Sequence, residues 1–250
     1  MQLLIEASVV LLAYIFGSIP SGLLVVKLSN GKDIRQVASG RTGGTNAMRA
    51  AGFGAGLITA AMDVLKGAAA VWVAQAISPE NQWLHILAPI AAILGHNYSI
   101  FLAERDETGR LRLRGGAGGG PTVGGALGLW WPSFFIIVPI GVLIFWGVGY
   151  ASITTLGIAV IATVIFSIRY SQGLSAWQDI LYGVMATLLL LYALRPNIKA
   201  LIEGRERFHG WRPWRKKEPD PPAVEKAAPK STRQNKKMIS SKKLIKSKQQ

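Results

Sequence analysis

Two connections between apolar stretches concentrate groups that bind phosphate. Residues 38–49 read Ala-Ser-Gly-Arg-Thr-Gly-Gly-Thr-Asn-Ala-Met-Arg, and residues 114–125 are dominated by glycine and lead into an apolar stretch. Glycine lets successive backbone N–H groups converge on one anion, and arginine binds phosphate through parallel hydrogen bonds. A glycine-rich turn before a helix also places an anion at the positive end of the helix dipole. Each loop alone is a weak signal; together, on one face, they predict a site for one or more phosphates.

The residue types also restrict the reaction. The chain has no cysteine, which excludes thiolate nucleophiles, disulfides and thiolate metal sites. Its three histidines lack the spacing of metal ligands, and none is followed by an acid five residues later, as a His-x4-Asp acyltransferase requires. Neither connection holds paired carboxylates. The remaining groups suit a reaction driven by positioning and electrostatic stabilisation, without a covalent enzyme intermediate.

The composition predicts that membrane helices position these loops. Half of the residues are apolar, only 16% are charged, and the mean hydropathy is +0.31. A transmembrane helix needs about 20 apolar residues. Pro132 divides the stretch 121–148, because proline breaks the helical hydrogen-bond ladder. The sequence therefore predicts an all-α polytopic protein with about seven transmembrane helices, over residues 3–26, 57–78, 84–103, 121–132, 133–148, 151–168 and 179–194.

The distribution of basic residues predicts the orientation. The connections after the first and third stretches hold five and four Lys/Arg, whereas 79–83 holds none and 169–178 only Arg169. The positive-inside rule then places the N-terminus outside and the C-terminus in the cytoplasm. Both phosphate-binding connections fall on the cytoplasmic face. Trp83, Trp130, Trp131, Tyr170 and Trp177 fall near the outer boundary, as an aromatic belt does.

We divide the chain into a membrane domain, 1–204, and a basic tail, 205–250. The tail holds 15 Lys/Arg and 4 Asp/Glu, so it carries +11 of the chain's net charge of +15. It also contains five prolines and has little apolar periodicity, which predicts disorder. Because it directly follows an apolar stretch, anionic lipid is the favoured partner and nucleic acid a disfavoured one. A solvated tail that only enforces orientation is an equal alternative.

Some charged, polar and small residues lie within the apolar stretches, where they indicate ion pairing or helix packing. Asp63 and Lys66 stand three residues apart on one helix, so they predict an internal ion pair, favoured over a direct ligand role. His96 and Asn97 close the third stretch. Gly124 and Gly128 have the small-xxx-small spacing of closely packed membrane helices.

Several motifs together resemble one family. Gly17-Ser18-Ile19-Pro20-Ser21-Gly22, Asp63-x-x-Lys66-Gly67 and Gly95-His96-Asn97-Tyr98 are similar to signatures of the bacterial membrane acyl-phosphate:glycerol-3-phosphate acyltransferases, the PlsY family. The resemblance covers about residues 10–208. It also rests on Asp33-Ile34-Arg35, Ser39-Gly40, Gly43, Thr45-Asn46, Arg49, Tyr150-Ala151-Ser152, Asn197-Ile198-Lys199, Gly204 and Glu206.

The resemblance implies a seven-helix protein of the inner (plasma) membrane that works without a metal or cofactor. Its reaction transfers a fatty acyl group from acyl phosphate to the 1-hydroxyl of glycerol 3-phosphate, giving lysophosphatidate and phosphate in phospholipid synthesis. The implied catalytic residues are Ser39, Thr45, Arg49, His96 and Asn197, and the implied substrate-binding residues are Arg41, Gly43, Asn46, Asn97, Gly116, Gly118, Thr122, Ser152 and Glu206.

The sequence departs from that family pattern in charged positions. A lysine of the second loop is replaced by Ala117, or by Gly118 if Thr122 anchors the motif. Leu194 and Ala200 replace a histidine and an arginine of the closing motif, and Arg41 replaces an asparagine. Arg41, Arg112 or Arg114 could supply the missing cation. The alternative is a catalytically altered or inactive relative that binds lipid phosphate or a partner; a transporter is disfavoured because the polar residues gather at one face.

Overall fold

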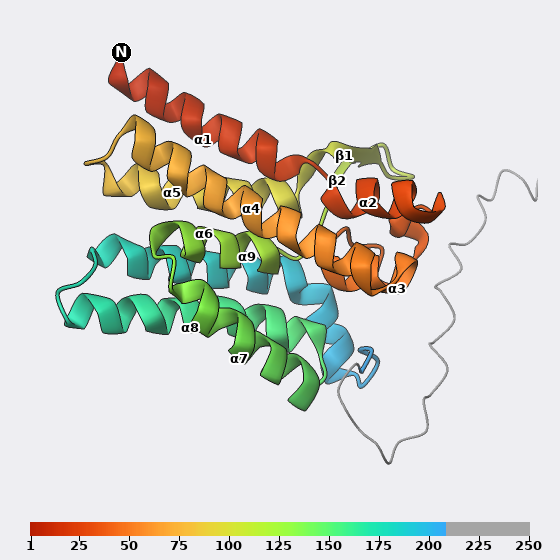
Figure 1. The fold of residues 1–250 in the computed structure, drawn as a ribbon. Helices are drawn as coiled ribbons and strands as arrows, with labels where there is room; N and C mark the ends of the chain where they lie inside the picture. The colour runs from red at the N-terminus through yellow and green to blue at the C-terminus, as the bar shows by residue number, and fades with distance from the viewer. Residues whose placement is uncertain (209–250) are drawn as a thin grey trace, which may run out of the picture. The chain divides into compact units, whose positions relative to one another are not determined.

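The computed structural model describes residues 1–208, which form a helical bundle with one two-stranded sheet (Figure 1). Every predicted apolar stretch contains a helix. The elements are α1 (Gln2–Ser18), α2 (Ser21–Asn30), the short 3-10 helix η1 (Ile34–Gln36), α3 (Gly44–Ala51), α4 (Phe53–Ile77), α5 (Gln82–Asn97), β1 (Ser99–Arg105), β2 (Leu111–Arg114), α6 (Gly119–Leu129), α7 (Ser133–Gly147), α8 (Ala151–Ser171) and α9 (Trp177–Ile202). The predicted tail lies, from residue 209 on, outside the described residues.

Four segments of residues 1–208 are long and apolar enough to cross a membrane. They are Gln2–Asn30, Phe53–Ile77, Ala151–Ser171 and Trp177–Ile202, and the apolar helix Ser133–Gly147 is shorter. Large apolar side chains such as Leu143 and Leu188 remain more than half exposed on their outer faces. In water such surfaces would be unfavourable, whereas lipid tails solvate them without cost. The fold is therefore that of a multi-pass membrane protein.

Proline places two of the helix breaks. The predicted break before Pro132 is confirmed, because α6 ends at Leu129 and α7 begins at Ser133. The first stretch was predicted as one helix, and this is wrong: α1 ends at Ser18 and α2 begins at Ser21. Pro20 lacks an N–H and disfavours the helical conformation at Ile19, whose ψ is 119°.

The third stretch also ends earlier than predicted. A helix over 84–103 was expected, but α5 stops at Asn97 and β1 pairs antiparallel with β2. The turn explains the hairpin: Asp106 Oδ1 accepts hydrogen bonds from the N–H groups of Thr108 (2.9 Å) and Arg110 (3.0 Å), and Gly109 adopts a φ of +77°. The all-α prediction therefore missed a two-stranded element.

Close helix packing holds the centre of the bundle. A Cβ added at Gly124 of α6 would lie 1.9 Å from the carbonyl oxygen of Val64 on α4, and one at Gly67 of α4 would lie 2.1 Å from that of Pro121. The absence of side chains lets the two backbones touch, which is the packing that the glycine spacing predicted. This contact fixes the start of α6 against α4.

Substitution of Gly124 by alanine should therefore lower the stability of the bundle. The obstructing atom is backbone and cannot rotate away, so we expect a loss of about 1–3 kcal/mol. The measurement is the melting temperature in detergent. Gly147→Ala is the matched control, because nothing lies within 4 Å of a Cβ there. Equal melting temperatures for the two variants would contradict the packing account.

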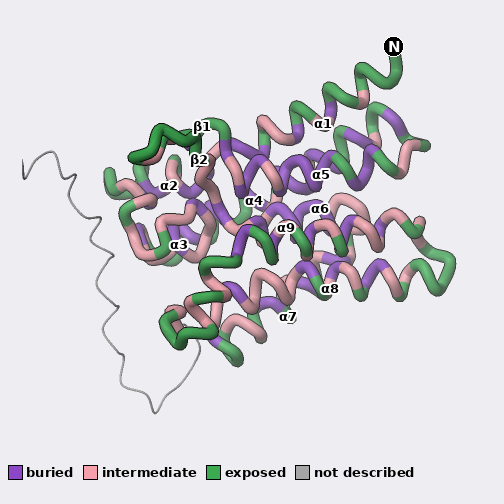
Figure 2. Tube along the Cα trace, turned by 180° about the vertical axis from the view of Figure 1, so that it is seen from behind, coloured by how far each residue is buried: buried purple, intermediate pink, exposed green. Residues whose placement is uncertain are grey.

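The two ends of the bundle differ in character. The aromatic end carries Trp83 and Trp177, whose rings stand edge to face at 5.4 Å, and Trp130, over which the Arg169 guanidinium lies at 4.1 Å. Figure 1 shows α2, α3 and the hairpin gathered at the opposite end, where α9 also finishes. Figure 2 shows the hairpin as one of the more exposed segments there. The loops predicted to bind phosphate all lie at this second end.

Candidate active site

The Arg41 side chain joins three segments that are far apart in the sequence. Its Nη1 donates a hydrogen bond to the carbonyl of Gly116 (2.8 Å), and its Nη2 to the carbonyl of Ala193 on α9 (2.5 Å). Asn197 Oδ1 accepts from Nε (3.3 Å) and Nη2 (3.1 Å) of the same guanidinium. The first loop, the glycine-rich loop and the second half of α9 therefore meet at one point, as the sequence predicted for the two loops.

The charge of Arg41 has no carboxylate partner within residues 1–208. All of its hydrogen-bond acceptors are neutral oxygens. Burial lowers the pKa of the guanidinium from its usual value, although arginine remains cationic near neutral pH. A half-buried cation without a counter-ion attracts an anion, so this point of convergence favours a phosphate.

The first loop is held in shape by Asn46. Its Nδ2 group lies within hydrogen-bond distance of three carbonyl oxygens, those of Ile34 (3.2 Å), Val37 (3.0 Å) and Arg41 (2.8 Å). Asn46 is thus built into the loop. Ser39 is exposed, its Oγ accepts from the Arg41 N–H (3.4 Å), and Gly43 caps α3, which carries Thr45 and Arg49.

The glycine-rich loop is clamped from two sides. The Gly116 N–H donates to the His96 carbonyl (2.9 Å), and the Gly115 carbonyl accepts from the Thr42 N–H (3.4 Å). Gly118 then caps α6 with a φ of +89°. Thr122 is fully buried and donates its hydroxyl to the Gly118 carbonyl (2.8 Å), so its side chain closes the first turn of α6. The cap of α6 thus lies two residues after Gly116, the loop residue that Arg41 contacts.

A buried group of charged and titratable side chains supports this clamp. Asp63 Oδ1 lies 3.0 Å from Lys66 Nζ and 3.5 Å from His96 Nδ1, and all three side chains are at most 5% exposed. Lys66 also donates to the Ile19 carbonyl (2.5 Å) at the break between α1 and α2. The predicted internal ion pair is confirmed, and His96 belongs to it. The opposite edge of the His96 ring faces Gly116.

Residues 7–204 match the family model described as glycerol-3-phosphate acyltransferase. The chain belongs to this family. The glycerol-3-phosphate acyltransferase of one Thermus thermophilus strain is 39% identical over 208 residues, which cover 81% of this chain and 94% of that protein. That of Rubrobacter xylanophilus is 35% identical over 84% of this chain and 98% of that protein.

A solved structure supports the same assignment. It is described as PlsY (YgiH), an integral membrane glycerol 3-phosphate acyltransferase, in its glycerol 3-phosphate form. It has a TM-score of 0.70 and 27% identity, and the match covers 82% of this chain and 96% of that one. The PlsY resemblance read from the motifs is therefore confirmed.

Two further residues of the resemblance, Ser152 at the start of α8 and Glu206, contact each other. Ser152 is buried and donates its hydroxyl to Glu206 Oε2 (2.6 Å), so the end of the described chain is tied to α8. Thr155, one turn further, faces Gly119 at the start of α6, where an added Cβ would lie 3.2 Å from its methyl group. The sequence analysis did not single out Thr155, which lies three residues after Ser152 on the same helix.

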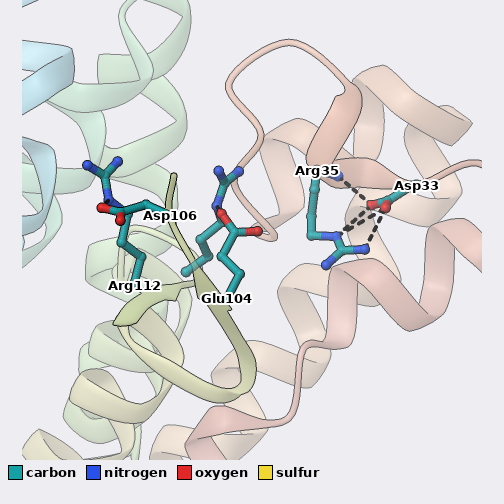
Figure 3. A network of polar contacts seen from close by, with 6 residues as sticks. Asp33, Arg35, Glu104, Asp106 and Arg112 are labelled. Carbon is teal, nitrogen blue, oxygen red and sulfur yellow. Dashed lines mark hydrogen bonds and ion pairs between the residues drawn. The ribbon is translucent and has the colours of Figure 1, made fainter. Parts of the chain in front are cut away.

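The hairpin arginines Arg112 and Arg114 are each paired with a carboxylate of the same hairpin. Arg112 Nε lies 3.0 Å from Asp106 Oδ2, and Arg114 is paired with Glu104. Figure 3 shows Arg112 beside Asp106 on the hairpin, away from the Arg35–Asp33 pair of the first loop, whose Nη2–Oδ2 distance is 2.7 Å. Of the three candidate cations, Arg41 is the one that reaches the glycine-rich loop.

The two positions left open for the family lysine differ in the space around them. A Cβ at Gly118 would lie 2.8 Å from Leu190 and 2.9 Å from Asn97, in a left-handed backbone conformation. A side chain at Gly118 would therefore be strained, which favours Ala117 over Gly118 as the position of the family lysine. Leu194, which replaces the family histidine, is buried in α9.

Proposed function

We propose that this protein transfers a fatty acyl group from acyl phosphate to the 1-hydroxyl of glycerol 3-phosphate. The observation that carries the proposal is the convergence of the two loops and α9 on the uncompensated Arg41 guanidinium. Both substrates bring a phosphate to the site, and a buried cation beside a helix N-terminus suits one. The family membership supplies the reaction class.

The reaction balances without a protein nucleophile. The glycerol hydroxyl oxygen bonds to the acyl carbon, the bond from that carbon to the phosphate oxygen breaks, and the hydroxyl proton leaves with the phosphate. The products are lysophosphatidate and inorganic phosphate. Because phosphate is a good leaving group, the protein has to position the two substrates and stabilise the oxyanion. Arg41 and the N–H groups at the start of α6 are suited to that role.

We assign phosphate binding to Ser39, Thr45, Arg49 and Ser152. The exposed hydroxyl of Ser39 stands next to Arg41. Gly43 caps α3, Thr45 lies in its first turn and Arg49 in its last. Ser152 donates its hydroxyl to Glu206, so its role in phosphate binding depends on that contact. His96, Asn46 and Thr122 hold the loops, while Asn97, Gly116, Gly118 and Asn197 line the space between them.

We further infer seven membrane crossings in the inner (plasma) membrane, with the N-terminus outside and the site at the cytoplasmic face. The argument is the charge difference between the connections, together with the Trp residues at the opposite end of the bundle. A basic tail on the cytoplasmic side would be attracted to anionic lipid. Nucleic acid is not a proposed partner, and no metal or cofactor enters the reaction.

Purified protein in detergent should form lysophosphatidate from palmitoyl phosphate and glycerol 3-phosphate. The Ser39→Ala variant should lower the rate at least tenfold, because it removes a hydroxyl beside the phosphate site. Ser29→Ala is the matched control, since Ser29 is an exposed serine on α2 that donates only to the Val25 carbonyl of its own helix. Product and released phosphate are measured together.

Two outcomes would change the proposal. Equal rates for the Ser39 and Ser29 variants would remove Ser39 from the site. Binding of phosphate without turnover, over several acyl lengths, would favour the alternative of a lipid-phosphate-binding relative. That alternative has one supporting observation, because Arg41 already donates to three protein acceptors.

A further inference from the structure

The side chain of Asn97 is buried without a hydrogen-bond partner. Asn97 is 4% exposed, and neither Nδ2 nor Oδ1 has a partner within the described residues. A buried amide that makes none of its hydrogen bonds costs roughly 1–3 kcal/mol. Such a group calls for an explanation, and a bound ligand that completes its hydrogen bonds is one.

Asn46 differs from Asn97 in that only its Oδ1 lacks a partner, whereas both polar atoms of the Asn97 amide do. Asn46 is similarly buried, at 3% exposed, yet its Nδ2 lies within hydrogen-bond distance of three carbonyl oxygens. Both asparagines lie next to the candidate site. One holds the loop together, and the other contributes nothing to the fold through its polar atoms.

The Asn97 amide faces the start of α6. A Cβ built at Gly118 would lie 2.9 Å from Asn97 Oδ1 and 3.1 Å from Nδ2, so the amide is directed at the residue that caps the helix. The first N–H groups of a helix have no partner within that helix and carry the positive end of its dipole. An anion bound at this end of α6 would therefore sit beside the unpartnered amide.

We propose that Asn97 is a substrate-contacting residue that binds glycerol 3-phosphate. Its Nδ2 group donates to a phosphate oxygen, and its Oδ1 accepts from a glycerol hydroxyl. This assignment rests on the proposed function and specifies which substrate lies here. Oδ1 requires a donor, and an ionised acyl phosphate offers only acceptor oxygens, whereas glycerol 3-phosphate offers hydroxyls as well.

Ligand-induced changes of melting temperature test the assignment. The probes are glycerol 3-phosphate and propyl phosphate, which carries the same phosphate without hydroxyls. The unmodified protein should bind glycerol 3-phosphate about tenfold more tightly, since one hydrogen bond in a buried site contributes roughly that factor. The Asn97→Leu variant, of nearly equal shape, should bind the two probes equally and weakly. In the acyl transfer assay it should raise KM for glycerol 3-phosphate and leave that for acyl phosphate unchanged.

The stability of the unliganded variants separates a binding role from a structural one. Asn97→Leu removes two unpaired polar atoms, so its melting temperature should equal or exceed that of the unmodified protein. Asn46→Leu, the matched control, should lower it clearly. A loss for Asn97→Leu similar to that for Asn46→Leu would overturn the proposal, as would equal binding of the two probes by the unmodified protein. Because binding is measured without turnover, an inactive protein that still discriminates between the probes would refute the proposed function alone.

Discussion

Replacing Arg41 with asparagine, the residue that the PlsY pattern has there, should lower kcat/KM by about 10²–10³-fold. The guanidinium is the cation in contact with the glycine-rich loop, and the loss of a group that stabilises the oxyanion has an effect of this order. The change also removes the link between the loop and α9. The initial rate of lysophosphatidate formation is the measurement, with Arg110→Asn on the exposed hairpin turn as the control for lost positive charge.

A second substitution separates charge from structure. In the Arg41→Asn background, Ala117→Lys should raise kcat/KM at least tenfold above that of Arg41→Asn alone, because it places a cation on the loop that Arg41 contacts. If the rate does not recover although the melting temperature of the double variant is normal, the guanidinium acts through its hydrogen bonds to Ala193 and Asn197 and not through its charge.

Gly116→Ala should reduce activity by about two orders of magnitude while the bundle remains folded. Its Cβ would lie 1.9 Å from His96 Nε2, and the ring has no room to withdraw, because it is 6% exposed and its Nδ1 faces Asp63. The loop must therefore shift, and displacement of positioned catalytic groups by about 1 Å can cost 10²-fold.

A second substitution should relieve the clash between a Cβ at residue 116 and the His96 ring. Removing the ring in a Gly116→Ala/His96→Ala variant should recover the melting temperature lost by Gly116→Ala alone. Gly54→Ala is the control, because an added Cβ there has nothing within 4 Å. Unchanged activity in Gly116→Ala would show that the ring and the loop are not in the contact described.

The parts of this architecture that depend on local pattern were predictable. Apolar length predicted a helix in each of the seven stretches but not α3, which lies in a polar connection, and Pro132 predicted the division of 121–148. The same rule applied to Pro20 would have divided the first stretch, but its continuous apolar pattern obscured the break. The hairpin was missed because Ile100, Phe101 and Leu102 extend an apolar run that has no helical or alternating period of its own.

The sequence predicted that the two loops lie together but not the contacts between them. Glycine, hydroxyl and arginine content identified both loops. Three candidate cations remained equivalent in sequence, because the hairpin partners of Arg112 and Arg114 depend on strand register. The link from Asp63 through His96 to Gly116 joins residues on three elements, and no spacing along the chain encodes it.

The buried Asp63–Lys66 pair has a consequence for biosynthesis. A lone charged residue near the middle of an inserting helix costs about 2.5–3.5 kcal/mol at the translocon, so either charge alone would impede the insertion of α4. Its two charges offset each other at once, since they lie on the same helix face. The Ile19 carbonyl, which accepts from Lys66, has already been synthesised, whereas His96 emerges only with the end of α5. During synthesis Lys66 and Asp63 thus gain their partners in sequence. The Ile19 carbonyl and the intrahelical pair are present first, and His96 follows when α5 packs against α4.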